Sequence, residues 1–138
     1  MLFFADIPET DEERLILKEG FNKLTGKIEK LVEREDEFRE VYRRTLNNIL
    51  KLQKDIFSGN IDIGDCFNRL AKIEDGLLTS ILNRLPGDVI DSLEKTADKK
   101  LKRYEDNMEE ESYEKTRRAF IKHLIRLDMK LPQIDPFT

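Results

Sequence analysis

One pair of residues has the types and the spacing of a catalytic pair. His123 is the single histidine among 138 residues, and Arg118 precedes it by five positions. A histidine can move the proton of an RNA 2′-hydroxyl group, while an arginine can bind the phosphate and the charge that develops on it. Five positions correspond to about 140° around a helix, so the two residues can equally belong to two unrelated faces of one helix.

The pair resembles the motif of HEPN ribonucleases, in which a histidine follows an arginine within a few residues. The resemblance implies a small helical bundle that cuts RNA without a metal ion at a dimer interface. HEPN motifs usually have a polar residue directly after the arginine, whereas Ala119 and Phe120 follow Arg118 here. Ribonuclease activity through Arg118 and His123 is therefore the alternative hypothesis for this chain.

Other kinds of catalytic or metal site lack their residues. Gly26-Lys27 has neither the upstream glycine nor the following Ser or Thr of a phosphate-binding loop. Cys66 is the single cysteine, so it cannot form an internal disulfide, and Cys66 and His123 alone cannot complete a zinc site. We expect Cys66 to be a small buried apolar residue, and we expect neither a metal nor a cofactor.

Charge is distributed unevenly along the chain. The net charge is −4, yet residues 1–40 carry 12 acidic and 7 basic side chains, and residues 112–138 carry 3 acidic and 6 basic ones. Such polarity suits docking of protein partners or self-association. Nucleic acid is a second, less favoured partner, and it would bind the basic residues of the last predicted helix: Lys115, Arg117, Arg118, Lys122, Arg126 and Lys130.

The first predicted helix carries a regular apolar seam. Thr10 and Glu13 have the spacing of a capping box, which predicts the start of the helix. Apolar residues then recur at spacings of four and three, as in a heptad. The seam is our candidate for a subunit interface, although packing inside the chain's own bundle explains it equally well. It consists of Leu17, Phe21, Leu24, Ile28 and Leu31.

Further apolar series predict the remaining helices. They run over residues 38–56, 63–85 and 89–104, and a last helix follows the acidic residues near 110 and ends at Pro132. Whether residues 11–57 form one helix or two stays open. In the last helix the apolar pattern predicts a buried face made of Tyr113, Phe120, Leu124, Ile125, Leu127 and Leu131.

The chain as a whole reads as one helical domain. No stretch shows the alternation of a strand, so we predict an all-α antiparallel bundle of four or five helices over residues 1–131, followed by an extended tail over residues 132–138. Whether the tail docks is open. No apolar run is long enough for a membrane span, and MLFFADIPET lacks the features of a signal peptide, so we expect a cytoplasmic protein. A charged content of 39% hints at a thermophilic source.

Three stretches together resemble the helical domain of archaeal GINS subunits. They are EFREVYRRTLNNIL, LAKIEDGLLTSILNRLPGDVIDSL and NMEEESYEKTRRAFIKHL, within residues 37–131. The resemblance implies a scaffold that forms a tetramer and bridges an MCM-type helicase to a RecJ-like partner. GINS subunits commonly carry a small β domain as well, which this sequence does not show, and basic and apolar residues usually follow the arginine matched by Arg84, where this chain has Leu85-Pro86-Gly87.

The sequence therefore favours a non-enzymatic protein–protein interaction subunit that self-associates or joins a hetero-oligomer. Strong apolar seams, polarised charge and an extended tail are features of interaction modules.

Overall fold

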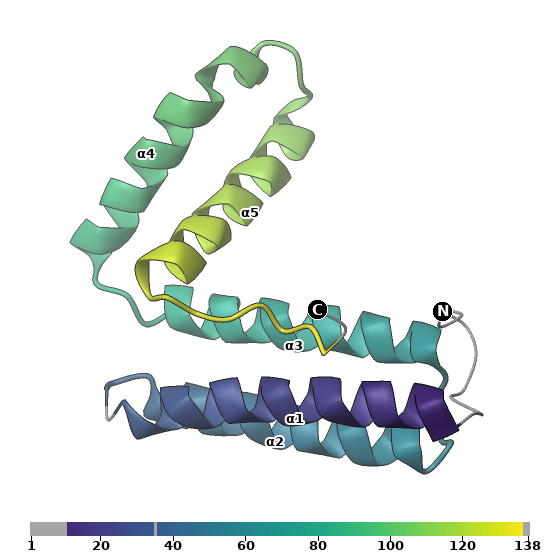
Figure 1. The fold of residues 1–138 in the computed structure, drawn as a ribbon. Helices are drawn as coiled ribbons and strands as arrows, with labels where there is room; N and C mark the ends of the chain where they lie inside the picture. Colours follow the sequence, from purple (N-terminus) through teal and green to yellow (C-terminus); the bar gives the residue numbers. More distant parts are fainter. Residues whose placement is uncertain (1–10, 35, 137–138) are drawn as a thin grey trace. The chain divides into compact units, whose positions relative to one another are not determined.

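The computed structural model describes residues 11–34 and 36–136, and it confirms the all-α prediction (Figure 1). These residues contain five helices and no strand: α1 (Asp11–Glu33), α2 (Arg39–Phe57), α3 (Ile63–Leu82), α4 (Gly87–Glu105) and α5 (Glu110–Asp128). Residues 11–57 thus form two helices. Thr10 lies outside the described residues, so its role in a capping box stays a prediction.

Contacts within the described residues divide the chain into two compact units. Unit 1 comprises residues 11–34, 36–77 and 132–136, and unit 2 comprises residues 78–131. The division falls inside α3, after Leu77. The single helical domain expected over residues 1–131 stays a prediction.

The break between α1 and α2 is held by Asp36. Its Oδ1 accepts the backbone N–H of Phe38 at 2.8 Å, and its Oδ2 accepts the Tyr42 hydroxyl at 3.3 Å. A short polar side chain that satisfies nearby backbone donors stabilises a turn against helix continuation. The polar stretch between the two apolar series is therefore a real helix boundary.

The heptad seam of α1 forms the core of unit 1. Its five residues are only 0–2% exposed, and Phe21 packs edge-on against Phe57 of α2 with ring centroids 6.2 Å apart. Side chains inside the chain's own core present no surface to a partner, so the structure supports the internal-packing alternative. The seam consists of Leu17, Phe21, Leu24, Ile28 and Leu31.

The predicted C-terminal tail docks on unit 1 within the described residues. Residues 132–136 form no helix and run beside α3 (Figure 1). Ile134 is only 5% exposed, and its backbone N–H donates to Glu74 Oε2 of α3 at 3.2 Å. Pro136 is buried and lies against Gly20 of α1.

Unit 2 is built around the α4–α5 hairpin. Ala97 and Leu101 of α4 are buried, as are Tyr113, Ile121 and Ile125 of α5. Pro86 precedes the first turn of α4, so the Pro86-Gly87 pair begins the fourth helix. The third helix, predicted to run to residue 85, ends at Leu82.

The buried face predicted for α5 is partly wrong. Leu127 is 60% exposed, and Phe120 and Leu124 are only half-buried, whereas Ile121 is buried. The buried residues follow a row with a spacing of four that includes Arg117, and Arg117 binds carboxylates of α4. Tyr113, Ile125 and Leu131 are buried as expected.

The end of α5 also differs from the prediction. The helix ends at Asp128, before Pro132, and Lys130 has a left-handed φ of 53°. The N–H of Leu131 donates to the Arg126 carbonyl at 2.9 Å, and that of Lys130 to the Leu127 carbonyl at 3.2 Å. These two bonds form a Schellman motif, in which Lys130 occupies the position usually taken by glycine.

Candidate functional site

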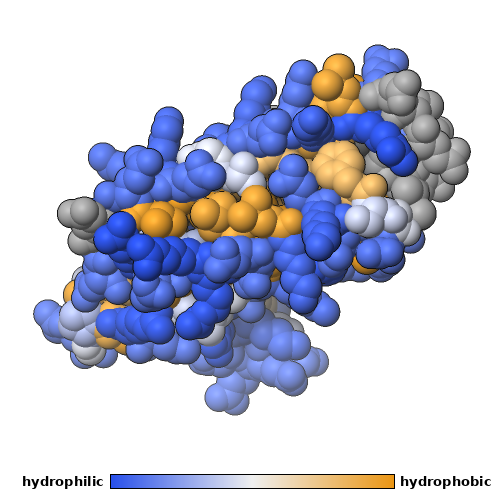
Figure 2. Space-filling view, turned by 90° about the horizontal axis from the view of Figure 1, so that it is seen from below, coloured by the Kyte–Doolittle hydropathy of each residue, from blue (hydrophilic) through white to orange (hydrophobic). Residues whose placement is uncertain are grey.

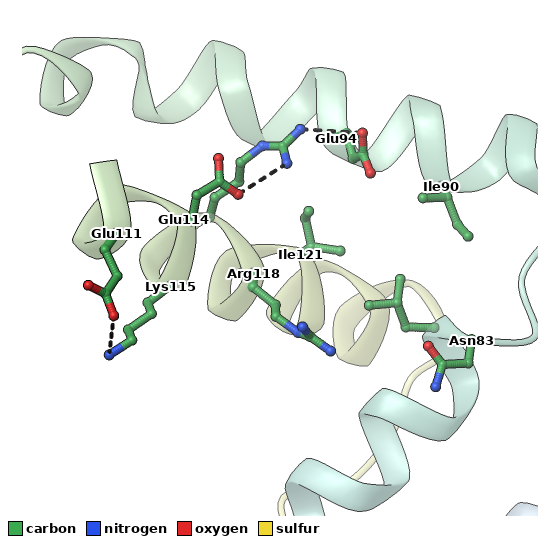
Figure 3. Close-up of a pocket in the computed structure, with 10 residues that line it drawn as sticks. Asn83, Ile90, Glu94, Glu111, Glu114, Lys115, Arg118 and Ile121 are labelled. Atoms are coloured by element: carbon green, nitrogen blue, oxygen red, sulfur yellow. Dashed lines mark hydrogen bonds and ion pairs between the residues drawn. The ribbon is translucent and has the colours of Figure 1, made fainter. Parts of the chain in front are cut away.

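An open cavity lies within unit 2, between the end of α3, α4 and α5 (Figure 3). It encloses about 610 Å³, which is within the range of ligand-binding clefts. Its apolar part comes from Leu82, Ile90 and Ile121, one residue from each of the three helices. Its charged part comes from Glu94 on α4 and from Glu111, Glu114, Lys115, Arg117 and Arg118 on α5, with Asn83 beside them.

Arg117 is the most strongly bound cation of the cavity. Its Nε and Nη2 donate to the two carboxylate oxygens of Asp98 at 2.7 and 3.3 Å, and Nη2 also donates to Glu94 at 3.3 Å. The same hydrogen bonds hold the pKa of Asp98 below its usual range and raise the pKa of Arg117 further. This fork joins α4 to α5 and fixes one wall of the cavity.

Tyr113 completes the same network. Its hydroxyl donates to Asp98 Oδ1 at 3.3 Å. Partial removal from water raises the pKa of Tyr113, and the neighbouring Asp98 carboxylate adds to the shift. The network is therefore structural, because each of its members is bound to another member.

Arg118 differs from its two cationic neighbours. Lys115 pairs with Glu111 at 3.8 Å, and Glu114, one turn before Arg118, pairs with Arg117 at 3.9 Å. Among the described residues, Arg118 itself forms no ion pair or hydrogen bond. Figure 3 shows its side chain extending toward the side of Asn83 and away from Glu111. It is the cation of this cavity that is available to a ligand.

His123 is not part of the cavity. It is exposed, its ring lies 6.4 Å from the ring of Phe120, and its Nδ1 accepts a hydrogen bond from the Arg126 guanidinium at 3.1 Å. Arginine is only a donor, so this contact requires an unprotonated Nδ1. The structure gives no contact between Arg118 and His123, which are separated by about 140° around α5.

The basic residues of α5 do not form a free cationic surface. Lys115 and Arg117 bind carboxylates, Arg126 binds His123, and Lys122 and Lys130 also have partners. Paired cations gain less from meeting phosphates, because the existing pairs must be broken first. Arg118 is the exception among the six.

Cys66 is buried, as the sequence predicts. It is 0% exposed in α3, and burial raises the pKa of its thiol to about 11, against a smaller opposing effect of Arg69. Within residues 11–34 and 36–136, no three His, Cys, Asp or Glu side chains gather where a metal ion would be held. None of the described helices has the length and hydropathy to cross a bilayer.

Apolar side chains also reach the surface. Figure 2 shows a band of them among polar residues on one face of the protein. In unit 1, α1 exposes Leu15 by 56% and Ile16 by 51%, and α2 exposes Leu50 by 45%. Leu46 and Phe57 are half-buried and fall on the same side of α2 as Leu50, since they are four and seven positions from it.

The sequence analysis named three residues of the cavity, Lys115, Arg117 and Arg118, as candidate nucleic-acid contacts, and it missed the others. Arg118 was a candidate, although for a different reaction. No sequence pattern marks Asn83, Ile90 and Ile121 as residues of one site, because they come from three segments that only the tertiary fold brings together. The exposure of Leu50 could not be recognised from the sequence, because its apolar neighbours in the same helix are buried.

Comparison of the chain with protein-family models, curated proteins and solved structures finds no match to it.

Proposed function

We propose that this protein is a non-enzymatic interaction subunit that binds a segment of another protein in the cavity of unit 2. The observation that carries the proposal is Arg118, which lines an open cavity with an apolar part and has no ion pair with any other residue that the structure describes. Protein anchors commonly combine an apolar side chain, which enters a pocket, with a charged group at its rim.

The geometry indicates the chemistry of the anchor. Leu82, Ile90 and Ile121 favour an apolar side chain, and Arg118 with Asn83 favours a carboxylate that accepts their N–H groups. Arg117 is already bound to Asp98 and Glu94, so it joins α5 to α4 at the side of the cavity and is not available to bind the ligand. A segment with an apolar residue next to an acidic one fits these groups.

Capture from an extract of the source cells tests the proposal. The wild-type chain is compared with Arg118→Gln and with Lys115→Gln, a control that removes a neighbouring cation whose pair is highly exposed. Proteins that use the cavity should bind the wild type and Lys115→Gln and should bind Arg118→Gln roughly tenfold more weakly. Equal capture by all three would contradict this site.

The identity of the captured proteins tests the resemblance to GINS subunits. Enrichment of an MCM-type helicase and a RecJ-like protein would support a scaffold of the replication machinery. Enrichment of RNA, lost on replacing Arg118 or His123 with alanine, would support the ribonuclease alternative instead. Nucleic-acid binding without cutting would appear as capture that falls steeply with salt and depends on several of the α5 cations.

A further inference from the structure

The segment of residues 132–136 is held as a peptide ligand is held. We call it the tail segment, and we call the surface that contacts it, with Gly20 of α1 and Glu74 of α3, the tail seat. The tail seat recognises the main chain through the Ile134 N–H, which Glu74 accepts, and it buries the Ile134 side chain to 5% exposure. A polar contact to the backbone combined with a buried side chain is how extended peptides are recognised.

Gly20 makes the seat fit this segment. A methyl group at position 20 would overlap the carbonyl group of Pro136, so any residue other than glycine forces the two backbones apart. Gly26, six positions later in α1, has no atom near enough to obstruct an added methyl group. The close approach at Gly20 is therefore specific to the tail seat, and it is not a general property of α1.

The tail segment suits the seat by its own sequence. It reads Pro132-Gln133-Ile134-Asp135-Pro136, with prolines on both sides of the buried isoleucine. Proline restricts the backbone to extended conformations, so less conformational entropy is lost when the segment docks. The left-handed turn at Lys130 directly precedes it and ends α5, so the segment leaves its own helix before it reaches the seat.

We propose that the tail seat is an exchange site, where the tail segment of a second copy of this chain replaces the resident one. The occupant is defined by the structure, because the seat already holds this Pro-x-Ile-x-Pro sequence and a second copy supplies the same contacts. Exchange of an identical element between copies conserves every interaction of the closed monomer and forms a symmetric dimer. The proposal is independent of the cavity in unit 2.

The protein concentration decides between the closed monomer and the exchanged dimer. A tethered segment competes at an effective concentration of about a millimolar. The wild type is therefore monomeric at micromolar concentration, and its exchanged fraction rises as the concentration approaches a millimolar. Disabling the internal contact in one copy removes this competition and makes exchange directly measurable.

Two complementary variants of the full chain provide the test. Gly20→Ala obstructs its own seat and releases its own tail segment. Ile134→Glu disables its own tail segment and leaves its seat empty. Neither variant can associate alone, but in a mixture the released tail segment of Gly20→Ala can enter the empty seat of Ile134→Glu.

We expect the mixture, at about a tenth of a millimolar, to show a species of twice the monomer mass by sedimentation, because this concentration lies well below the effective concentration at which a tethered tail segment competes. Isotope-labelled Ile134→Glu should show amide shifts in α1 and α3 when unlabelled Gly20→Ala is added. Gly26→Ala is the matched control, because its tail segment stays docked, and in place of Gly20→Ala it should leave the mixture monomeric.

The result that would overturn the proposal is a mixture of folded variants in which both proteins stay monomeric and no amide shifts. Association that Gly26→Ala supports as well as Gly20→Ala would overturn it too, because the contact would then not involve the seat. If Ile134→Glu does not fold, Ile134→Ala replaces it, since it removes the anchoring side chain without adding a charge.

Discussion

Cys66 shows how burial governs a single titratable residue. Its side chain is 0% exposed and the pKa of its thiol is about 11, compared with about 8.5 for an exposed cysteine. Tyr42 behaves alike: burial, aided by the charge of Asp36, raises the pKa of its hydroxyl to about 12. In both cases the folded chain favours the protonated form, because a buried anion loses its hydration.

The raised pKa values predict loss of stability in alkali. A group whose pKa is raised by folding contributes its full stability below its unfolded pKa, and the contribution is lost as the pH rises through the folded value. The free energy of unfolding should therefore fall from about pH 8.5 upward. Urea denaturation at pH 7 and pH 10 measures this change.

The matched variant for this prediction is Cys66→Ala, which removes the thiol and keeps a small apolar side chain. Its stability should fall less steeply between pH 7 and pH 10 than that of the wild type. An identical pH profile would show that Cys66 has no part in the alkaline loss. Slow alkylation of Cys66 in the folded chain and fast alkylation in urea would independently confirm its burial.

At the scale of the helix, α1 shows that two glycines of one element can have opposite roles. Gly26 faces open space, so it lowers the stability of the helix and makes no close contact that requires a glycine. Gly20, in contrast, allows the backbone of Pro136 to approach α1 closely. Replacement of glycine by alanine inside a helix normally gains about 1 kcal/mol. At Gly20 this gain is opposed by loss of the docked tail segment.

We predict that Gly26→Ala raises the melting temperature and that Gly20→Ala lowers it. The loss at Gly20 includes exposure of Ile134, which contributes about 1.5 to 3 kcal/mol when buried. Thermal unfolding followed by circular dichroism measures both. In the Ile134→Glu background, where the tail segment is already released, Gly20→Ala should become stabilising, and a destabilising effect there would contradict this explanation.

The face that α5 buries shows why apolar spacing alone misled the analysis. Phe120, Leu124 and Leu127 form a stripe as regular as the observed one, and the sequence offers no means of choosing between them. The buried row contains Arg117, which bonds to Asp98 and Glu94 of α4. A charged residue within a buried row is invisible to a search for apolar periodicity.

At the scale of the whole molecule, one leucine in the core and one at the surface can be compared. Leu24 is 1% exposed in α1, and Leu50 is 45% exposed in α2. We predict that Leu24→Glu destabilises the protein by about 4 kcal/mol, because it places an unpaired charge in the core. Leu50→Glu should change the stability by less than about 0.5 kcal/mol.

The same two variants test the exposed apolar band as a contact surface. Leu50→Glu should keep the wild-type melting temperature and reduce the capture of any partner that covers α2. A folded Leu24→Glu variant with native stability would instead show that the seam is not the core of unit 1.

Much of the fold could be predicted from the sequence, because heptad spacing and helix-stopping residues are local signals. The helical segments of the described chain follow from them, with errors of a few residues at Leu82 and Asp128, whereas the division of residues 11–57 into two helices does not. The docking of the tail segment could not be predicted, since Gly20 and Ile134 are nearly the whole chain apart and neither carries a local signal. The cavity was missed for the same reason, apart from its cations Lys115, Arg117 and Arg118.

The division of unit 1 into two pieces of chain sets an order of events during protein synthesis. Residues 78–131 lie between the two pieces of unit 1 in the sequence, so all of unit 2 is synthesised before the tail segment is translated. Unit 1 lacks Ile134 and Pro136 until that moment, and Gly20 and Glu74 stay uncovered on the nascent chain. Because domains form as their residues emerge, the contact between α1 and the tail segment forms after α1 has packed against α2.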